Sequence, residues 1–299
     1  MKRSDVLDYF KSLQDAIHDE FQSFDPQMKW EEDQWNRPGG GGGRSRAGRS
    51  GDVWEKGGVN FSDVHGDLNA AMRIQLKTQA NSFKATGVSL VMHPKSPHVP
   101  IVHMNVRHFT LDNGVEWFGG GIDLTPHYVE EKEAALFHQT LKSVCDEFNS
   151  DWYAAFKKQA DDYFYLPHRQ ETRGVGGIFF DELGASSEID LGVAFDFVQA
   201  VGNVFLLSYL PLVRRKKDIN IEQRHLAWQK IRRGRYVEFN LVHDRGTRFG
   251  LVSNGRTESI LMSMPPLAAW EYNAQLSLHS EEALTQSLLK KGVDWMGKR

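Results

Sequence analysis

Residues 98–126 read HVPIVHMNVRHFTLDNGVEWFGGGIDLTP, two strand-like runs separated by an Asp-Asn-Gly sequence. Both runs are rich in β-branched and aromatic residues, which favour strands. The Asn113-Gly114 dipeptide is a strong signal for a tight turn between paired strands. This stretch therefore predicts an antiparallel β-hairpin, around which the rest of the fold can be worked out.

The first strand of this hairpin has an unusual polar face. Alternate side chains of a strand point to the same side, at steps of roughly 6.6 to 7 Å. One side therefore carries His103, Asn105, Arg107 and Phe109. In the simpler interpretation this side is a solvated sheet surface, and Val102, Met104 and Val106 face the core. In the functional interpretation the planar guanidinium of Arg107 holds a carboxylate through two parallel hydrogen bonds.

The length of the hairpin loop decides where Asp123 lies. With a strict two-residue loop Asp123 faces Met104, on the side away from Arg107. A three-residue loop, or a bulge at the glycines 119–121, brings Asp123 round to the side of Arg107. The sequence pattern leaves both arrangements open.

Outside the hairpin, strands and helices occur in separate groups. Apolar residues at helical spacing predict helices over 6–21, 130–164 with a break at 149–151, 187–209, 222–231 and 280–289. Strands are predicted from residue 53 to about 118 and, within 236–264, in the runs YVEFNLVHD, RFGLVS and ESILMSM. Pro211 is expected to end the helix predicted over 187–209. Antiparallel-looking strand pairs favour an α+β fold over a doubly wound sheet, and we expect one domain over residues 1–299.

A glycine- and arginine-rich segment lies at about 36–51. Five consecutive glycines are followed there by Arg44, Arg46 and Arg49. The segment lacks the GK[ST] ending of a phosphate-binding loop, which disfavours nucleotide binding. We expect a mobile, cationic loop, either a plain linker or a lid whose arginines close over an anionic substrate.

The charge balance and the cysteine count exclude several classes of protein. The 299 residues contain 36 Lys+Arg and 39 Asp+Glu, a formal net charge of −3, so no overall field favours nucleic acid or a membrane surface. A single cysteine, Cys145, excludes an internal disulfide framework and a four-thiolate metal site. We find no signal core near Met1 and no run of roughly 20 apolar residues, so we expect a cytoplasmic protein without a membrane span.

Four histidines raise the question of a metal site, because neutral imidazole is a common metal ligand. They are His93, His103, His138 and His168. They fall in separate predicted elements, and the sequence contains no HExxH pair or other local ligand spacing. Surface or structural histidines are the alternative interpretation, and both stay open.

Nine segments between Trp30 and Tyr272 together resemble the oxygen-dependent coproporphyrinogen III oxidases, and they follow the order found in that family. They are GGGGRSR, GVNFSDVHG, GVSLVMHP, HMNVRHF, WFGGGIDLTP, DDYFYLPHR, GVGGIFFDEL, RRGRYVEFNLVHDRGT and GRTESILMSMPP. The resemblance implies an oxidoreductase of haem biosynthesis that converts coproporphyrinogen III to protoporphyrinogen IX. Two propionates become vinyl groups, O2 is consumed, and CO2 and hydrogen peroxide are released.

The resemblance also implies roles for individual residues. His103 corresponds to the family's proposed acid, and Asp123 corresponds to an aspartate that meets the pyrrole nitrogens. Arg107 is expected to hold the reacting propionate. The substrate-contacting positions correspond to Ser89, Asn105, Val106, Arg107 and the turn Asn254, Gly255 and Arg256. The implied substrate carries four carboxylates around a bowl-shaped ring of four pyrroles. A site for it needs arginines at the rim and an apolar, aromatic wall.

The family's cofactor and assembly are further expectations. Metal positions given for bacterial members correspond to His93, His103, His138 and His168, whereas the family is described as needing neither a metal nor an organic cofactor. A divalent metal therefore stays an open alternative. The implied architecture is a large, flat antiparallel sheet with helices on both faces, in a homodimer whose interface lies around 236–271.

Two other functions remain as alternatives. One is a histidine-ligated metal oxygenase, and the other is a tetrapyrrole carrier without catalysis. The oxygen-independent route to the same product needs a cysteine-bound iron–sulfur cluster, which Cys145 alone cannot hold.

Overall fold

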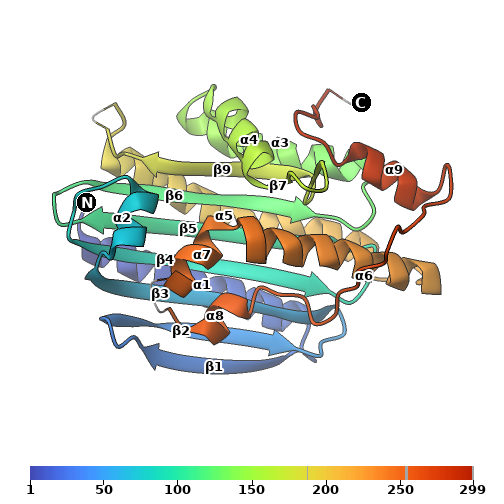
Figure 1. Ribbon diagram of the computed structural model, residues 1–299, viewed down its shortest axis with the longest axis horizontal. Coiled ribbons are helices and arrows are strands. Elements are labelled where there is room, and N and C mark those ends of the chain that lie inside the picture. Colours follow the sequence, from blue (N-terminus) through green and yellow to red (C-terminus); the bar gives the residue numbers. More distant parts are fainter. Residues whose placement is uncertain (187, 253–254, 298–299) are drawn as a thin grey trace.

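The protein is an α+β structure built on one open antiparallel sheet. The computed structural model describes residues 1–299 except 187, 253–254 and 298–299. Seven described strands pair in the order β1-β2-β3-β4-β5-β6-β9, so six consecutive strands form a meander that β9 extends (Figure 1). They are β1 (Lys29–Asn36), β2 (Gly41–Arg49), β3 (Trp54–Asp67), β4 (Ser82–Pro94), β5 (Ile101–Leu111), β6 (Glu116–Thr125) and β9 (Gly176–Leu183). The strands β7 (Tyr165–Leu166) and β8 (Glu171–Thr172) pair separately.

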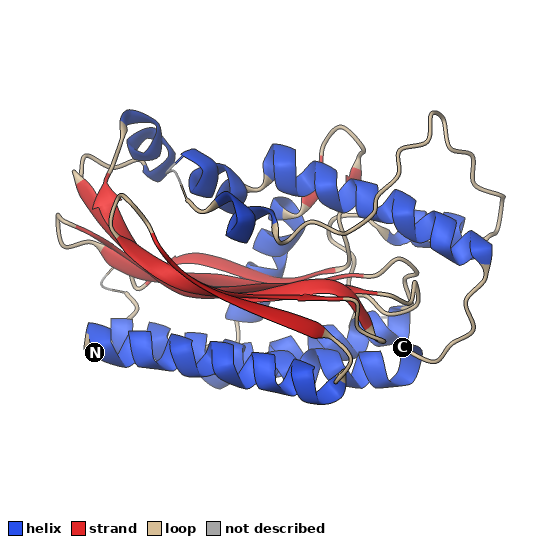
Figure 2. Ribbon diagram, turned by 90° about the horizontal axis from the view of Figure 1, so that it is seen from below, coloured by secondary structure: helices blue, strands red, loops and turns tan. Residues whose placement is uncertain are grey.

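One face of the sheet is covered by four helices, which include the two longest helices of the described residues (Figure 2). They are α1 (Arg3–Phe24), α3 (Glu131–Phe148), α4 (Trp152–Tyr163) and α5 (Leu191–Lys216). Helix α1 buries the apolar stripe that its sequence spacing predicts, from Val6 to Phe21, against the sheet. Val102, Met104 and Val106 of β5 belong to the same core, so this side of β5 is apolar.

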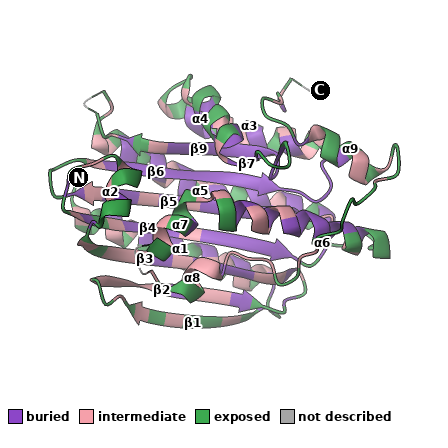
Figure 3. Ribbon diagram, viewed as in Figure 1, coloured by how far each residue is buried: buried purple, intermediate pink, exposed green. Residues whose placement is uncertain are grey.

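The opposite face carries a second set of helices (Figure 1), and the polar side of β5 lies on this face. They are α2 (Ala70–Leu76), α6 (Gln223–Glu238), a π-helical turn η1 (Phe239–His243), α7 (Arg245–Val252) and α8 (Thr257–Leu261). Helix α9 (Glu281–Leu288) follows near the C-terminus. The predicted layout, a sheet with helices on both faces, is confirmed. The central strands are the most buried and the edge strand β1 is largely accessible (Figure 3).

The prediction of a mobile loop at 36–51 was wrong, because most of this segment forms β2. Residues 42–49 pair with β1, and residues 41–49 pair with β3. Glycine is needed at Gly43, where a Cβ atom would lie 2.4 Å from the Trp35 ring. The arginines are held in ion pairs, as between Arg46 and Glu32 at 2.8 Å. Pairing on both sides orders a glycine-rich run that has little strand preference by itself.

The strands predicted within 236–264 were also wrong, because the described part of this segment is mostly helical. It completes α6 and continues through η1, α7 and α8. Its β-branched and aromatic residues favour a strand locally. In the structure, however, these residues pack onto the sheet: Phe239 is fully buried, and Met262 lies against Gly58. Packing onto the sheet face therefore overrides the local preference.

Helix α5 departs from expectation in two ways. It continues through Pro211 to Lys216, and the carbonyl that Pro211 leaves without its helical partner belongs to Leu207, on the exposed side of the helix. It is also the one helix in the described ranges that is long and apolar enough to cross a membrane, by length and composition alone. Here it packs on β5 and β6 of the sheet, beside α1 and α3, and core helices share that length and composition.

Candidate functional site

The hairpin loop contains three residues, and this places Asp123 on the polar side of β5. The Leu111 N–H donates to the Val115 carbonyl at 2.8 Å, which closes a loop of residues 112–114. Gly114 supplies the left-handed conformation, with φ of 85°. Asp123 consequently lies directly opposite His103 and shares a sheet face with Arg107. Of the two registers that the sequence left open, the three-residue loop is the one that forms.

Asp123 is a buried carboxylate held by two cationic or potentially cationic groups. Its Oδ1 atom lies 2.7 Å from His103 Nδ1. Arg173 Nη2 donates to both carboxylate oxygens, at 2.9 and 2.7 Å. Burial alone raises the pKa of Asp123, but the charge of Arg173 and the contact with His103 outweigh burial and lower it. The site therefore keeps a negative charge in the interior of the protein.

Sequence reasoning missed Arg173, the partner of this carboxylate. It lies between β8 and β9, in the run ETRGVGG, and its side chain is 2% exposed. Its Nη1 atom donates to Asn240 Oδ1 at 2.8 Å. Its guanidinium lies over the rings of Phe164, Tyr236 and Phe239, at 4.5, 4.5 and 4.7 Å. The available signal in the sequence was a single arginine within an apolar and glycine-rich run. Such a run is expected to be buried, and a buried arginine needs an acidic partner.

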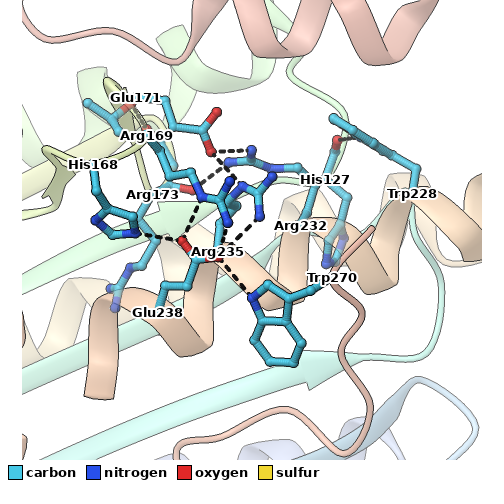
Figure 4. Close-up of polar contacts among 12 residues, drawn as sticks. His127, His168, Arg169, Glu171, Arg173, Trp228, Arg232, Arg235, Glu238 and Trp270 are labelled. Atoms are coloured by element: carbon cyan, nitrogen blue, oxygen red, sulfur yellow. Dashed lines mark hydrogen bonds and ion pairs between the residues drawn. The ribbon is translucent and has the colours of Figure 1, made fainter. Parts of the chain in front are cut away.

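The backbone around Arg173 is tied to helix α6 (Figure 4). Arg232 Nη1 donates to Glu171 at 2.7 Å, and its Nη2 donates to the Arg173 carbonyl at 3.3 Å. Close by, Glu238 accepts hydrogen bonds from Arg169, His168 and the Trp270 indole. These contacts fix the segment that presents Arg173 to Asp123.

Arg107 lies on the same sheet face as Asp123, four residues after His103 along β5. Its Nη1 atom donates to Asn105 Oδ1 at 2.8 Å, and its Nη2 atom forms an ion pair with Asp181 at 2.8 Å. The guanidinium lies 6.0 Å from the centre of the Phe179 ring and is 30% exposed. Ser89 lies beside Asn105 on the neighbouring strand. An incoming anion can therefore reach Arg107 from solvent.

Val106 does not contribute a side chain to this face. It is fully buried in the main core, on the opposite side of the sheet from Arg107. Alternation along β5 dictates this, so only the backbone of Val106 can take part in the site.

An aromatic wall with two further charged groups borders Asp123 and Arg107. Tyr163 stacks on Phe179 with ring centres 4.3 Å apart, and its hydroxyl donates to Asp244 at 2.6 Å. Burial raises the pKa of Asp244, but hydrogen bonds from Tyr163 and Thr247 outweigh burial and lower it. The Arg245 guanidinium lies 4.9 Å from the Tyr163 ring centre. Flat aromatic surface with guanidinium groups around it suits a planar ligand that carries carboxylates.

The predicted substrate-contacting turn lies elsewhere in the structure. Asn254 is outside the described residues. The Gly255 N–H donates to the Gly250 carbonyl at 2.8 Å, and Arg256 is ion-paired with Asp33 of β1. Strand β1 is four strands from β5, about 19 Å at roughly 4.8 Å per strand. The structure therefore does not bring Arg256 to Arg107.

The four histidines considered as metal ligands are not brought together. His93 Nε2 is bonded to the Ser263 carbonyl, and both ring nitrogens of His138 are occupied, by Tyr153 and Val175. His103 contacts Asp123, and His168 contacts Glu238. Within the part of the chain that the structure describes, no group of three or more His, Cys, Asp or Glu side chains could hold a metal. These residues do not fit the expected metal site, because each ring serves a different local contact.

Comparison with known families gives a match over nearly the whole chain. The family model described as "Coproporphyrinogen III oxidase" matches residues 5–295. The match includes every strand of the sheet and all the residues that surround Asp123 and Arg107.

Proposed function

Because the chain belongs to the coproporphyrinogen III oxidase family, oxidoreductases of haem biosynthesis, we propose that it is the oxygen-dependent enzyme of that family. It would convert two propionates of coproporphyrinogen III to vinyls and release protoporphyrinogen IX, CO2 and hydrogen peroxide. The observation that carries this proposal is the buried Asp123 carboxylate, which is hydrogen-bonded to His103 and Arg173. It lies on the same sheet face as the partly exposed side chain of Arg107.

Arg107 would bind the carboxylate of the reacting propionate. Its planar fork matches a carboxylate, and its partial exposure lets the ligand approach. Phe179 and Tyr163 would lie against the pyrrole rings, whose carboxylates extend beyond the apolar centre of the molecule. Arg245, over the Tyr163 ring, is placed to meet a second carboxylate.

Asp123 would accept a pyrrole N–H. A carboxylate oxygen has two lone pairs, and among the described residues Oδ2 accepts a hydrogen bond only from Arg173. The negative charge would stabilise positive charge that develops on the ring as the porphyrinogen loses electrons. Arg173 and its aromatic neighbours would keep the carboxylate in position.

The reaction balances with O2 as the only oxidant. Each propionate carboxylate leaves as CO2, the carbon next to the ring loses one proton, and two electrons leave the substrate, so that a vinyl group forms. Two electrons and two protons are transferred to O2, which becomes hydrogen peroxide; the second proton of the peroxide is supplied separately. His103, which is partly exposed and contacts Asp123, would donate a proton to the reduced oxygen. No step requires an organic cofactor or a metal held by these residues.

We also propose a homodimer in the cytoplasm. The segment 236–271 exposes apolar side chains whose exposed fractions are 43–57%. They are Leu241, Val242, Leu251, Val252, Leu267 and Trp270. An apolar surface of this kind favours contact with a second copy of the chain. The single buried thiol, Cys145, is consistent with a reducing compartment.

The proposal is tested by following protoporphyrin fluorescence after addition of coproporphyrinogen III. Air-saturated, anaerobic and chelator-treated samples are compared. Turnover that needs O2 and survives exhaustive chelation supports the proposal. Turnover abolished by the chelator would support a metal oxygenase, and binding without turnover in air would support a carrier. Either result would overturn the proposal.

A further inference from the structure

Arg107 is already paired with a carboxylate of the protein itself. Asp181 of β9 contacts Arg107 Nη2 at 2.8 Å, while Asn105 takes Nη1. The side chains of Arg107 and Asp181 are 30% and 32% exposed, so the pair lies at the accessible edge of the site. A ligand carboxylate must therefore share Arg107 with Asp181 or displace it.

The register of β9 places Asp181 against Arg107, and a β-bulge follows directly after it. The register between β6 and β9 shifts between Phe118 and Gly120, so Asp181 and Glu182 both lie opposite the single residue Gly119. Glu182 takes the left-handed conformation, with φ of 55°, and its N–H donates to Asp181 Oδ1 at 3.1 Å. Alternation after the core residue Phe180 puts Asp181 on the face of the site, and the extra residue returns Leu183 to the apolar core. A regular strand would leave Leu183 on the polar face.

Gly119 provides the surface on which this ion pair lies. A Cβ atom at this position would be 2.7 Å from Asp181 Oδ1 and 2.8 Å from Arg107 Nη2. Both neighbouring atoms are ends of flexible side chains, so a methyl group there would move the pair while the strands remain paired. The absence of a side chain at Gly119 therefore lets Asp181 contact the Arg107 guanidinium across β6.

We propose that Asp181 is a positioning residue that orients Arg107 for the reacting carboxylate and competes with that carboxylate for the guanidinium. This inference rests on the proposed function. It deepens it by naming the residue that sets both the affinity and the orientation of the anion contact. The negative charge of Asp181 weakens the binding of a tetracarboxylate, and its contact keeps Arg107 in the productive geometry.

The test separates charge from position by using three variants. Asp181→Asn removes the charge and keeps an acceptor oxygen, whereas Asp181→Ala removes both. Gly119→Ala keeps both charges and displaces the pair. Glu182→Gln is the matched control, because it neutralises the exposed neighbouring carboxylate. Each protein is titrated with coproporphyrin III, the oxidised and unreactive tetracarboxylate, and assayed with coproporphyrinogen III for kcat and KM.

The expected result is a split between affinity and rate. Asp181→Asn and Asp181→Ala tighten coproporphyrin III binding about threefold to fivefold, since a half-exposed charge pair is worth no more than this. The kcat falls about tenfold in Asp181→Asn and further in Asp181→Ala, because Arg107 loses its orientation. Gly119→Ala lowers kcat without tightening binding, and Glu182→Gln stays within about twofold of the unmodified protein.

Three results would overturn the inference. One is unchanged affinity and kcat in both Asp181 variants, and another is loss of thermal stability alone. The third is an equal effect of Glu182→Gln, which would show a general charge effect. If Arg107→Ala abolishes porphyrin binding while the Asp181 variants behave like the unmodified protein, only this inference fails. If the unmodified protein neither binds coproporphyrin III nor converts coproporphyrinogen III, the proposed function fails and this inference fails with it.

Discussion

His103 and Asp123 lie opposite each other on neighbouring strands, and Nδ1 of the histidine is 2.7 Å from Oδ1 of the aspartate. This contact exists because the loop between the strands has three residues. A two-residue loop would place Met104 opposite Asp123 and turn the carboxylate toward the main core. One residue of loop length thus decides whether the site contains its buried charge.

Arg107→Ala should lower kcat/KM for coproporphyrinogen III by about 100-fold, since it removes a charged hydrogen-bond donor to the ligand carboxylate. Stability should change by less than about 1 kcal/mol, because Arg107 is part-exposed and its partner Asp181 remains solvated. Arg49→Ala, at a side chain that is 72% exposed, is the control. Steady-state kinetics and urea unfolding measure the two effects, and near-normal turnover in Arg107→Ala would refute its assigned role.

Asp123→Ala should abolish activity and also destabilise the protein by about 3 kcal/mol or more. The reason is that Arg173 would remain buried without a counter-charge. Urea unfolding followed by tryptophan fluorescence measures the loss. Asp33→Ala, which breaks a half-exposed pair with Arg256, should cost under about 1 kcal/mol. Equal losses in the two variants would show that the Asp123–Arg173 pair is not the buried anchor described above.

Stability should fall as the pH is lowered from 6.5 toward 4. Burial lowers the pKa of His138 from 6.5 to about 4, and its contact with the Val175 carbonyl offsets only part of this effect. Within this window the unfolded chain binds a proton at His138 and the folded protein does not, so folding weakens by up to about 1.4 kcal/mol per pH unit. His138→Gln should reduce the slope. Unfolding at pH 7 and pH 5 tests this, and parallel slopes in the two proteins would contradict it.

Replacement of the apolar surface of η1 should dissociate the proposed dimer. Leu241→Lys combined with Val242→Lys introduces charge at side chains that are 50% and 57% exposed, within the proposed interface. Leu207→Lys is the control, because Leu207 is 72% exposed on α5, which covers the opposite face of the sheet. Sedimentation velocity should show monomers for the double variant and dimers for the control. Dimers in both would place the interface elsewhere.

Local pattern was sufficient for much of the architecture. The apolar stripe of α1, the hairpin of β5 and β6, and the shared face of Asn105 and Arg107 all follow from side-chain periodicity. These features depend on neighbours within a few residues. For that reason they could be predicted without knowledge of the fold.

Contacts between residues that are far apart in the sequence decided the rest of the fold and of the site. Arg173 joins Asp123 from 50 residues away, and Asp181 reaches Arg107 because β9 pairs with β6. The described residues within 236–264, strand-like in composition, are mostly helical because packing onto the sheet face buries side chains such as Phe239 and Met262. The sequence by itself determined which charged and aromatic groups are present and which strand faces they share. Only the tertiary structure determined which of them meet, because burial forces each buried charge to find its partner wherever the fold brings one near.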